Sequence, residues 1–382
     1  MNERILSKAK EIFLALCLIS KEVPQAVVRQ MEKDYGSNIR KTVIYKLKTK
    51  GYIKKVGLRG NYGFTITEKG NEYIRKHFAE KYNCDLYRDY YLKLSYQENT
   101  RLRNQALCCL LYYMVRHNIS ITNHLEEFVE LQNSQQGSEK TYFITSKEVR
   151  NTHPRYNIIK GSKFYGILVT PQALYVIYYP DNQQLQEKTE GLLEEVLEVI
   201  YKNSYYNGKI YPIFFFDNEK NLQMSFVNDI SKMGSTTMST RLYYTTNKYG
   251  KNKVCIMNDV AGQIQETIDE EFSEKVIQVF KDYYNLTPVD EELRISEWAD
   301  GMYEKETLTV ILNDIDPHKI VKLNQYIRET HRKSLVLCYD DQVKAIKEVF
   351  KLNQSVFDRL LIATLPRNEV KKYITGETHS LE

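Results

Sequence analysis

Apolar residues recur at helical spacing in three successive segments near the start of the chain. The segments are residues 4–20, 25–34 and 38–50. Pro24 suits the first turn of the second segment, because proline lacks the N–H group that would have no partner there. A turn at Gly36 separates the second segment from the third. The pattern predicts three short helices.

Two short segments with strand composition follow the third predicted helix. Ser37 is expected to cap that helix, and Gly51 to end it in the conformation that glycine favours. Residues 52–56 and 62–66 are rich in aromatic and β-branched residues, and the segment between them has the composition of a hairpin turn. Thr67 is placed to cap a closing helix. The predicted order is helix, helix, helix, strand, strand, helix.

This order, together with two short motifs, resembles the winged-helix domains of bacterial DNA-binding regulators. The motifs are Leu47-x3-Gly51-Tyr52-Ile53 and Phe64-Thr65-Ile66-Thr67-x2-Gly70. The resemblance implies that residues 1–80 are a winged helix-turn-helix domain, in which the third helix docks on DNA and the hairpin forms the wing. Another small α/β domain is the alternative interpretation.

Residues 81–139 have the pattern of a helical connector. Within them, a long helix is expected to begin at Asn99 and end at His117, with apolar residues spaced for burial. Such a helix either forms a homodimer with a second copy of the chain or packs within its own chain. Residues 133–140 (NSQQGSEK) have linker composition, and they set the expected boundary of an α/β domain over residues 140–382.

The C-terminal part alternates strands and helices. Residues 164–170 and 173–179 predict a hairpin, and residues 210–216 predict a buried strand. Residues 307–365 have the order strand, helix, strand, helix, strand, which predicts a βαβαβ unit with parallel strands and right-handed crossovers. The fold class expected for the chain is α+β and α/β: an N-terminal winged helix-turn-helix followed by a C-terminal α/β domain.

Two sequence strings at the start of the C-terminal part carry a second resemblance. They are YFITSKEV (residues 142–149) and GSKFYGIL (residues 161–168). Together with the organisation of the chain, they make it similar to the winged-helix replication-relaxation proteins of conjugative plasmids and integrative elements of Gram-positive bacteria. The resemblance implies a role in replication, in conjugative transfer or in control of those genes. It brings no catalytic residue with it.

The positive charge of the chain is concentrated near its start. The sequence is 42% hydrophobic, which excludes a disordered chain, and its formal net charge is +5. Residues 37–62 hold eight Lys or Arg residues and no Asp or Glu. The same stretch carries Ile39, Val43 and Leu47 at helical spacing, so one face can pack while the other stays charged. The expected partner is therefore double-stranded DNA.

Seven residues of this stretch are expected to face the duplex. Arg40 and Lys41, near the start of the third helix, are candidates for base edges in the major groove. Lys48 and the two hairpin lysines are candidates for phosphate contacts, and Arg59 at the hairpin tip is a candidate for the minor groove. The full set is Arg40, Lys41, Tyr45, Lys48, Lys54, Lys55 and Arg59. A solvated basic face without a partner is the alternative.

The cysteine pattern and the hydropathy predict a cytoplasmic protein. The six cysteines include no C-x-x-C pair, which is typical of reduced, packed cysteines rather than of disulfides or a zinc site. The sequence holds no run of about 18 apolar residues, so no membrane partner is expected. No signal-peptide pattern is visible in it.

Carboxylates follow three of the predicted strands of the C-terminal part. They are Asp217, Asp314, Asp316, Asp340 and Asp341. Ligands of open α/β sheets collect at the carboxyl ends of strands, so these residues are weak candidates for catalysis around Mg²⁺. Helix capping is the alternative, and the preferred interpretation, for Asp316, which is followed by a proline, and for Asp340.

The sequence leaves three classes of function open. The leading hypothesis is a DNA-binding protein that needs no cofactor. The second is a Mg²⁺-dependent DNA nuclease or relaxase with its acidic site at the strand ends. The third is a regulator whose α/β domain binds a small effector. The histidines form no H-x-H or H-E-x-x-H group, and glycine-rich phosphate loops are absent from the sequence.

Overall fold

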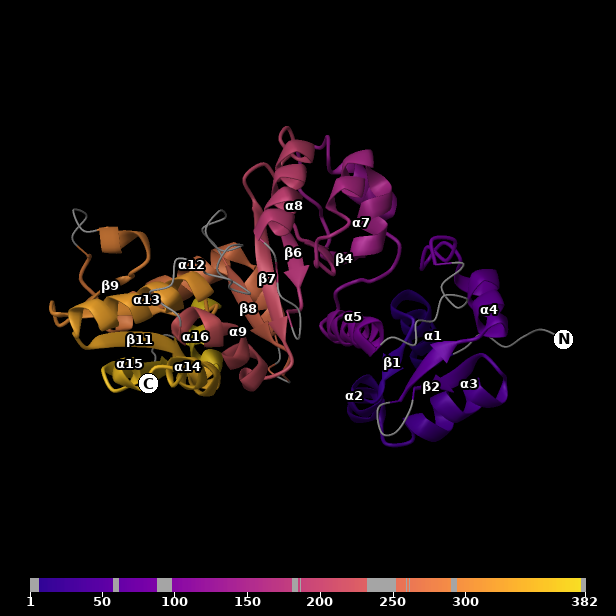
Figure 1. Ribbon diagram of the computed structural model, residues 1–382, viewed down its shortest axis with the longest axis horizontal. Helices are drawn as coiled ribbons and strands as arrows, with labels where there is room; N and C mark the ends of the chain where they lie inside the picture. Colours follow the sequence, from indigo (N-terminus) through magenta and orange to yellow (C-terminus); the bar gives the residue numbers. More distant parts are fainter. Residues whose placement is uncertain are drawn as a thin grey trace. The chain divides into compact units, whose positions relative to one another are not determined.

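The structure, a computed structural model, describes residues 7–57, 62–87, 98–180, 185, 187–231, 252–258, 260, 262–289 and 294–378. Contacts within the chain divide it into two compact units. The first holds Met1–Val129 and Thr141–Glu148, and the second holds Glu130–Lys140 and Val149–Glu382. Both combine helices with sheets, so the expected mixture of α and β structure is confirmed (Figure 1). Residues 81–129, expected to be a connector, group with the first unit.

Three helical segments begin the first unit, as the apolar pattern predicts. They are α1 (Lys8–Ser20), α2 (Gln25–Tyr35) and a third segment in which a π-helix, Arg40–Tyr45, continues into α3 (Lys46–Thr49). The side chains of α1 are buried from Ile12 onwards, and this helix contacts the third segment, α4 and α5. Burial on all sides is expected of a helix at the centre of a domain.

A small antiparallel sheet accompanies these helices. Its strands are β1 (Val23–Pro24), β2 (Ile53–Val56) and β3 (Gly63–Ile66), in the order β1-β3-β2. The β2–β3 hairpin confirms the two predicted strands, whereas β1 is too short to leave a recognisable pattern in the sequence. The closing helix is α4 (Glu68–Phe78), and the Gly70 N–H donates to Thr67 Oγ1 at 3.1 Å, which confirms the predicted cap.

The start of the third helical segment differs from the prediction. Ser37 does not cap it, because the segment begins after Ile39 and the Asn38 carbonyl accepts the first N–H groups. The N-cap position is occupied by Ile39, two residues later, whose side chain has no oxygen that could accept a hydrogen bond. The end of the segment agrees with the prediction, since Gly51 has a φ of +73°.

A long helix, α5 (Glu98–Arg116), follows, and then come α6 (Leu125–Glu130) and β4 (Tyr142–Thr145). The buried side chains of α5 pack against α1, α2 and β1. Arg101 of this helix forms a bidentate ion pair with the buried carboxylate of Glu22, with nitrogen–oxygen distances of 2.6 and 3.0 Å. The apolar face of α5 is therefore covered by its own chain, as in the second of the two alternatives that the sequence leaves open.

One sheet of the second unit contains the predicted hairpin. β5 (Gly166–Val169) and β6 (Leu174–Tyr178) pair antiparallel, and β7 (Ile210–Phe216) and β8 (Lys253–Ile256) continue the sheet with parallel pairing, in the order β5-β6-β7-β8. The helices near these strands in sequence are α7 (Ser146–Thr152), a 3-10 helix (Pro154–Ile159), α8 (Glu187–Ile200), α9 (Glu219–Ser231), α11 (Gln263–Ile268) and α12 (Glu270–Tyr283).

The other sheet of this unit contains the predicted βαβαβ unit, which is confirmed. Its strand order is β12-β11-β10-β9, and the first three of these strands are parallel. The strands are β9 (Gly301–Tyr303), β10 (Thr307–Ile311), β11 (Ser334–Tyr339) and β12 (Leu360–Leu365). The helical elements are 3-10 helices at Arg294–Glu297 and Asp340–Gln342, with α13 (Pro317–Thr330), α14 (Val343–Phe350), α15 (Gln354–Phe357) and α16 (Arg367–Ile374).

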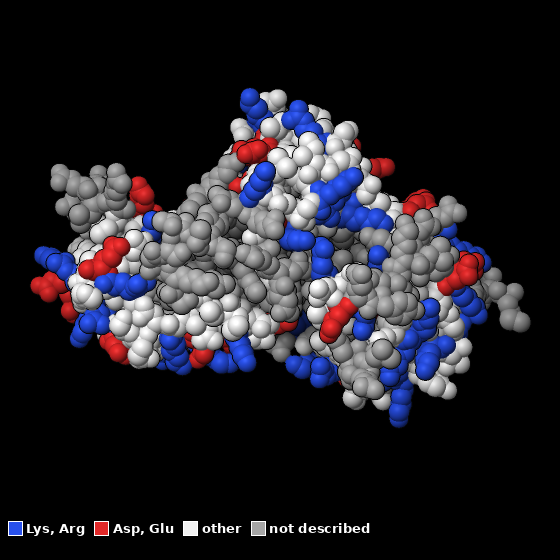
Figure 2. All heavy atoms as spheres, in the orientation of Figure 1, with Lys and Arg blue, Asp and Glu red and all other residues white. Residues whose placement is uncertain are grey.

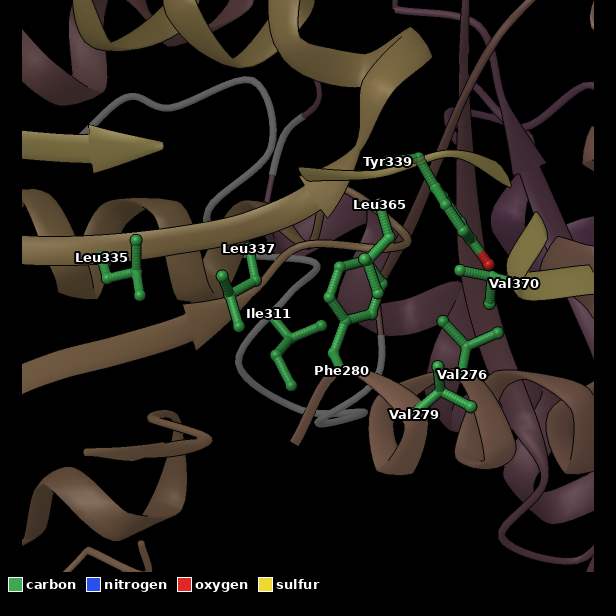
Figure 3. Close-up of a cluster of buried hydrophobic side chains, with 9 residues drawn as sticks. All are labelled: Val276, Val279, Phe280, Ile311, Leu335, Leu337, Tyr339, Leu365 and Val370. Atoms are coloured by element: carbon green, nitrogen blue, oxygen red, sulfur yellow. The ribbon is translucent and has the colours of Figure 1, made fainter. Parts of the chain in front are cut away.

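One face of this second sheet packs on α12 and α16. Side chains of successive strand residues point to opposite faces, so alternate residues share a core. The buried cluster that they form is Val276, Val279, Phe280, Ile311, Leu335, Leu337, Tyr339, Leu365 and Val370 (Figure 3). This core fixes the carboxyl ends of β10 and β11, where four of the candidate aspartates lie.

Candidate nucleic-acid interface

The third helical segment divides its side chains between the core and the solvent. Ile39, Val43, Ile44 and Leu47 are buried. The side chain of Tyr45 is 66% exposed, although large aromatic residues are usually covered. The other exposed residues of the segment and its end are Arg40, Lys41, Thr42, Lys46, Lys48, Thr49 and Lys50. The core thus holds a helix whose outward face is rich in lysine.

Two carboxylates of the neighbouring helices, those of Glu11 and Asp34, are bound by residues outside the third segment. Glu11 accepts hydrogen bonds from Lys81 Nζ at 2.6 Å and from the Tyr82 hydroxyl at 2.7 Å. Asp34 accepts from the Tyr112 hydroxyl at 2.6 Å and pairs with Arg116 at 2.9 Å.

The outward lysines keep their charge unopposed. Among the residues that the structure describes, Lys41, Lys48 and Lys54 form no ion pair with a carboxylate. Figure 2 shows Lys and Arg side chains gathered over the region that Figure 1 labels α3 and β2. A surface of this kind attracts polyanions.

Arg40 is placed differently from the other candidates. Its Nε donates to Glu32 Oε1 at 2.8 Å, and its Nη1 donates to Gln25 Oε1 at 3.1 Å. Both acceptors belong to α2, so the guanidinium ties α2 to the start of the third segment. The sequence pattern could not reveal this pair, because the fold sets the approach of the two helices. The role expected for Arg40, direct contact with base edges, does not match a side chain that is held in this way.

The side chains of the two hairpin lysines, Lys54 and Lys55, point to opposite faces of β2. Lys54 lies opposite Thr65 and Lys55 lies opposite Phe64 in the β2–β3 register, and neighbouring strand residues point to opposite sides. Lys55 Nζ lies 3.6 Å from the centroid of the Tyr62 ring, a cation–π contact. From the sequence, both lysines are expected to contact phosphates, and side chains on opposite faces do not favour a common contact. Arg59, the candidate at the hairpin tip, lies outside the described residues.

A hollow of about 240 Å³ adjoins the outward face of the third segment. We call it the three-lysine hollow; its lining residues are Lys10, Tyr45, Lys46, Leu47, Thr49 and Lys50. Burial lowers the pKa of Lys10, and the charges of Lys46 and Lys50 lower it further. None of these three lysines is among the seven residues that the sequence predicts to face the duplex. The only linear signal is the four-residue spacing of Lys46 and Lys50, and nothing in the sequence brings Lys10 beside them.

Asp314 and Asp316 lie in a buried group of charges after β10. Burial raises the pKa of both carboxyls; the charge of Asp314 raises that of Asp316 further, to about 8, while Lys319 and Lys253 oppose the shift at Asp314. Lys319 Nζ also pairs with Asp300 at 2.8 Å. Asp316 Oδ1 accepts the His318 N–H at 2.9 Å, so its predicted role as the cap of α13 is confirmed.

Asp340 and Asp341 follow β11 and belong to a separate network. Asp341 pairs with Arg367 at 2.5 Å, and Arg367 also pairs with the buried Glu266 at 2.8 Å. Asp340 is not the cap that the sequence predicts: Tyr339 occupies that position, and Asp340 accepts the N–H groups of Asp341 and Arg367 at 2.9 and 3.4 Å. The cavity beside this network measures about 10 Å³, roughly the space of one water molecule.

Asp217, the remaining candidate, follows β7 and is exposed. Its carboxylate accepts a hydrogen bond from the hydroxyl of Tyr179. The described residues contain no group of three or more His, Cys, Asp or Glu side chains that could hold a metal ion. The strand-end aspartates are thus engaged in a cap, in ion pairs and in a tyrosine contact, and the described contacts do not gather them into one open site.

Comparison of the chain with protein-family models, with curated proteins and with solved structures finds no match. The two resemblances stated from the sequence therefore depend on the quoted motifs and on the order of elements alone. Every helix among the described residues is too short or too polar to cross a lipid bilayer.

Proposed function

We propose that the chain binds double-stranded DNA through the third helical segment and the β2–β3 hairpin, in the manner of a winged helix-turn-helix domain. The observation that carries the proposal is the exposed lysine face, with Lys41, Tyr45 and Lys48 outward, on a helix whose other face is buried. The order of helices and strands and the sheet order β1-β3-β2 support the winged-helix assignment.

The dimensions of the segment suit the major groove. Its helical residues run from Arg40 to Thr49, and a helix of about ten residues fits a groove roughly 12 Å wide. Lys54 lies on the adjacent hairpin, where it can reach the sugar–phosphate backbone beside the groove. Because Arg40 is held by Glu32, Lys41 and Tyr45 are the better candidates for base edges.

The resemblance to replication-relaxation proteins supports a narrower proposal, in which this binding serves the replication or transfer of a mobile genetic element. The second unit would then provide contacts with partner proteins. The contacts described for the strand-end aspartates do not favour a nuclease, so we make no second proposal of function. Incubation with supercoiled plasmid and Mg²⁺ should shift the plasmid in a gel without nicking it.

The test is a titration of a fluorescein-labelled duplex, followed by fluorescence anisotropy at several salt concentrations. If about six phosphates are neutralised, the log–log salt slope should be roughly −5. The double variant Lys41→Glu/Lys48→Glu should weaken binding by at least about tenfold, since it removes two positive charges and adds two negative ones.

The matched control changes charge equally on the second unit. Lys160 and Lys333 are exposed there, and Lys160→Glu/Lys333→Glu carries the same change of net charge. Equal loss of affinity in both double variants would show a general effect of charge and would contradict the proposed interface. Duplex binding that does not respond to salt would contradict it as well.

A further inference from the structure

The three-lysine hollow gathers cations from two separate elements. Lys10 comes from the first turn of α1, whereas Lys46 and Lys50 stand one helical turn apart at the end of the third segment. The other lining residues are Leu47, Tyr45 and Thr49. Three lysines from two elements therefore border one hollow, and no Asp or Glu is among the described residues that line it.

The charges of the hollow repel one another in the free protein. Like charges four residues apart on a helix destabilise it, and Lys46 and Lys50 have this spacing. The lowered pKa of Lys10, caused by its burial and by these two lysines, reports the same repulsion. The carboxylate next in sequence to Lys10, that of Glu11, is bound by Lys81 and Tyr82 and does not relieve it. An anion in the hollow would relieve it.

The hollow is continuous with the outward face of the third segment. Tyr45 and Thr49 line the hollow and are also exposed residues of that face. A polyanion that covers Lys41 and Lys48 therefore passes beside the entrance to the hollow. If that polyanion is duplex DNA, the negative charges beside the hollow are the phosphates of its backbone.

We propose that the three-lysine hollow is a phosphate-binding subsite, in which Lys10, Lys46 and Lys50 together hold one phosphodiester group of bound duplex DNA. This inference rests on the proposed function and extends it, because it brings α1 into contact with the duplex beyond the third segment and the hairpin. The three ammonium groups donate to the oxygens of that one phosphate.

The experiment compares Lys10→Gln, Lys46→Gln and the double variant with the wild-type chain, using the same labelled duplex over a range of KCl concentrations. Each single variant should weaken binding roughly threefold to tenfold. Because the two lysines share one phosphate, the double variant should lose less than the product of the single losses. Its log–log salt slope should fall by about 0.9, the value for one phosphate, and not by about 1.8.

Two outcomes would overturn the inference while leaving the proposed function standing. One is unchanged affinity and slope in Lys10→Gln/Lys46→Gln when Lys41→Glu/Lys48→Glu loses binding. The other is independent loss at the two lysines, with a slope change corresponding to two phosphates. A wild-type chain that does not bind the duplex at all would overturn both proposals. Thermal unfolding of each variant, compared with Lys160→Gln, verifies that the exposed substitutions leave the fold intact.

Inorganic phosphate is the second probe, because a small free anion carries the same chemistry as a backbone phosphate. At constant ionic strength, phosphate in place of chloride should raise the unfolding temperature of the DNA-free wild-type chain, because an anion in the hollow relieves the repulsion among its lysines. The rise should be absent from Lys10→Gln/Lys46→Gln, and an equal response of the two chains would contradict the inference.

Discussion

Arg40 is bound by Glu32, eight residues earlier in the chain, with a distance of 2.8 Å between Nε and Oε1. The pair joins α2 to the start of the third helical segment, and Gln25 adds a further acceptor from α2. The side chain of Arg40 is 44% exposed, so solvent screens the pair. Its effect on the proposed DNA-binding surface is twofold: it withdraws one cation from the outward face and ties the start of the third segment to α2.

The first prediction concerns this pair. Glu32→Gln should release Arg40 and remove a negative charge beside the interface, so duplex binding should tighten a few-fold while stability falls by less than about 1 kcal/mol. The measurements are anisotropy titration and urea unfolding of Glu32→Gln, Arg40→Ala and the double variant. Weaker duplex binding by Glu32→Gln would show that the ion pair itself is needed to present the helix.

The second prediction separates the two hairpin lysines. Lys54→Glu should weaken duplex binding more than Lys55→Glu, because the two side chains point to opposite faces of β2 and Lys55 already lies over Tyr62. Lys55→Glu should instead lower the unfolding free energy by about 0.5–1 kcal/mol, through loss of the cation–π contact. The two variants have the same net charge, so each is the control for the other. Equal effects on binding would mean that both lysines reach the DNA.

The third prediction concerns the residue that joins the third segment to α4. The Thr67 hydroxyl donates to the Gly51 carbonyl at 2.5 Å and accepts the Gly70 N–H at 3.1 Å. Thr67→Val keeps the shape and loses both hydrogen bonds, so unfolding by urea should require about 1–2 kcal/mol less. Thr67→Ser keeps the hydroxyl and should stay within about 0.5 kcal/mol of the wild-type chain. If the two variants were equally stable, the cap would contribute nothing.

The sequence predicts those features of this protein that depend on local periodicity. The hairpin, the Thr67 cap and the βαβαβ unit follow from residues close together in the chain, and the structure contains them. The opposite faces of Lys54 and Lys55 also follow from a local period, the alternation of side chains along a strand, although the prediction from the sequence groups the two lysines together. The Arg40–Glu32 pair and the approach of Lys10 to Lys46 depend on how helices meet. No spacing in the sequence encodes those meetings, because they are set by packing around α1.

For the strand-end aspartates of the second unit, the sequence likewise predicts position but not contacts. Their positions after the strands follow from the sequence, since parallel strands end at one edge of a sheet. Their ion pairs do not follow from the sequence. Arg367, which pairs with Asp341 and Glu266, comes from the start of α16, and the position of that helix is a result of the tertiary fold. In the fold, these aspartates form ion pairs and cap a helix, as Asp341 and Asp316 do.

The last prediction concerns the pH dependence of the second unit. The pKa of Asp316 is raised to about 8, first by burial and then by the charge of Asp314, whereas its value in an unfolded chain is about 3.9. Between these two values the folded chain binds more protons at this site than the unfolded chain does. The contribution of Asp316 to stability is therefore full below about pH 4 and is lost as the pH rises through about 8.

Asp316→Asn should remove this contribution to the pH dependence, because an amide does not titrate and asparagine caps a helix as well as aspartate does. In the wild-type chain, the unfolding free energy should carry a term from Asp316 that falls by up to about 1.4 kcal/mol per pH unit between pH 5 and 7.5. Urea unfolding of both chains at several pH values in that range measures the difference. Asp316→Ala, which loses the cap, should be the less stable of the two variants at every pH. Identical pH profiles for the wild-type chain and Asp316→Asn would show that Asp316 is ionised throughout, with Lys319 and Lys253 compensating for its burial.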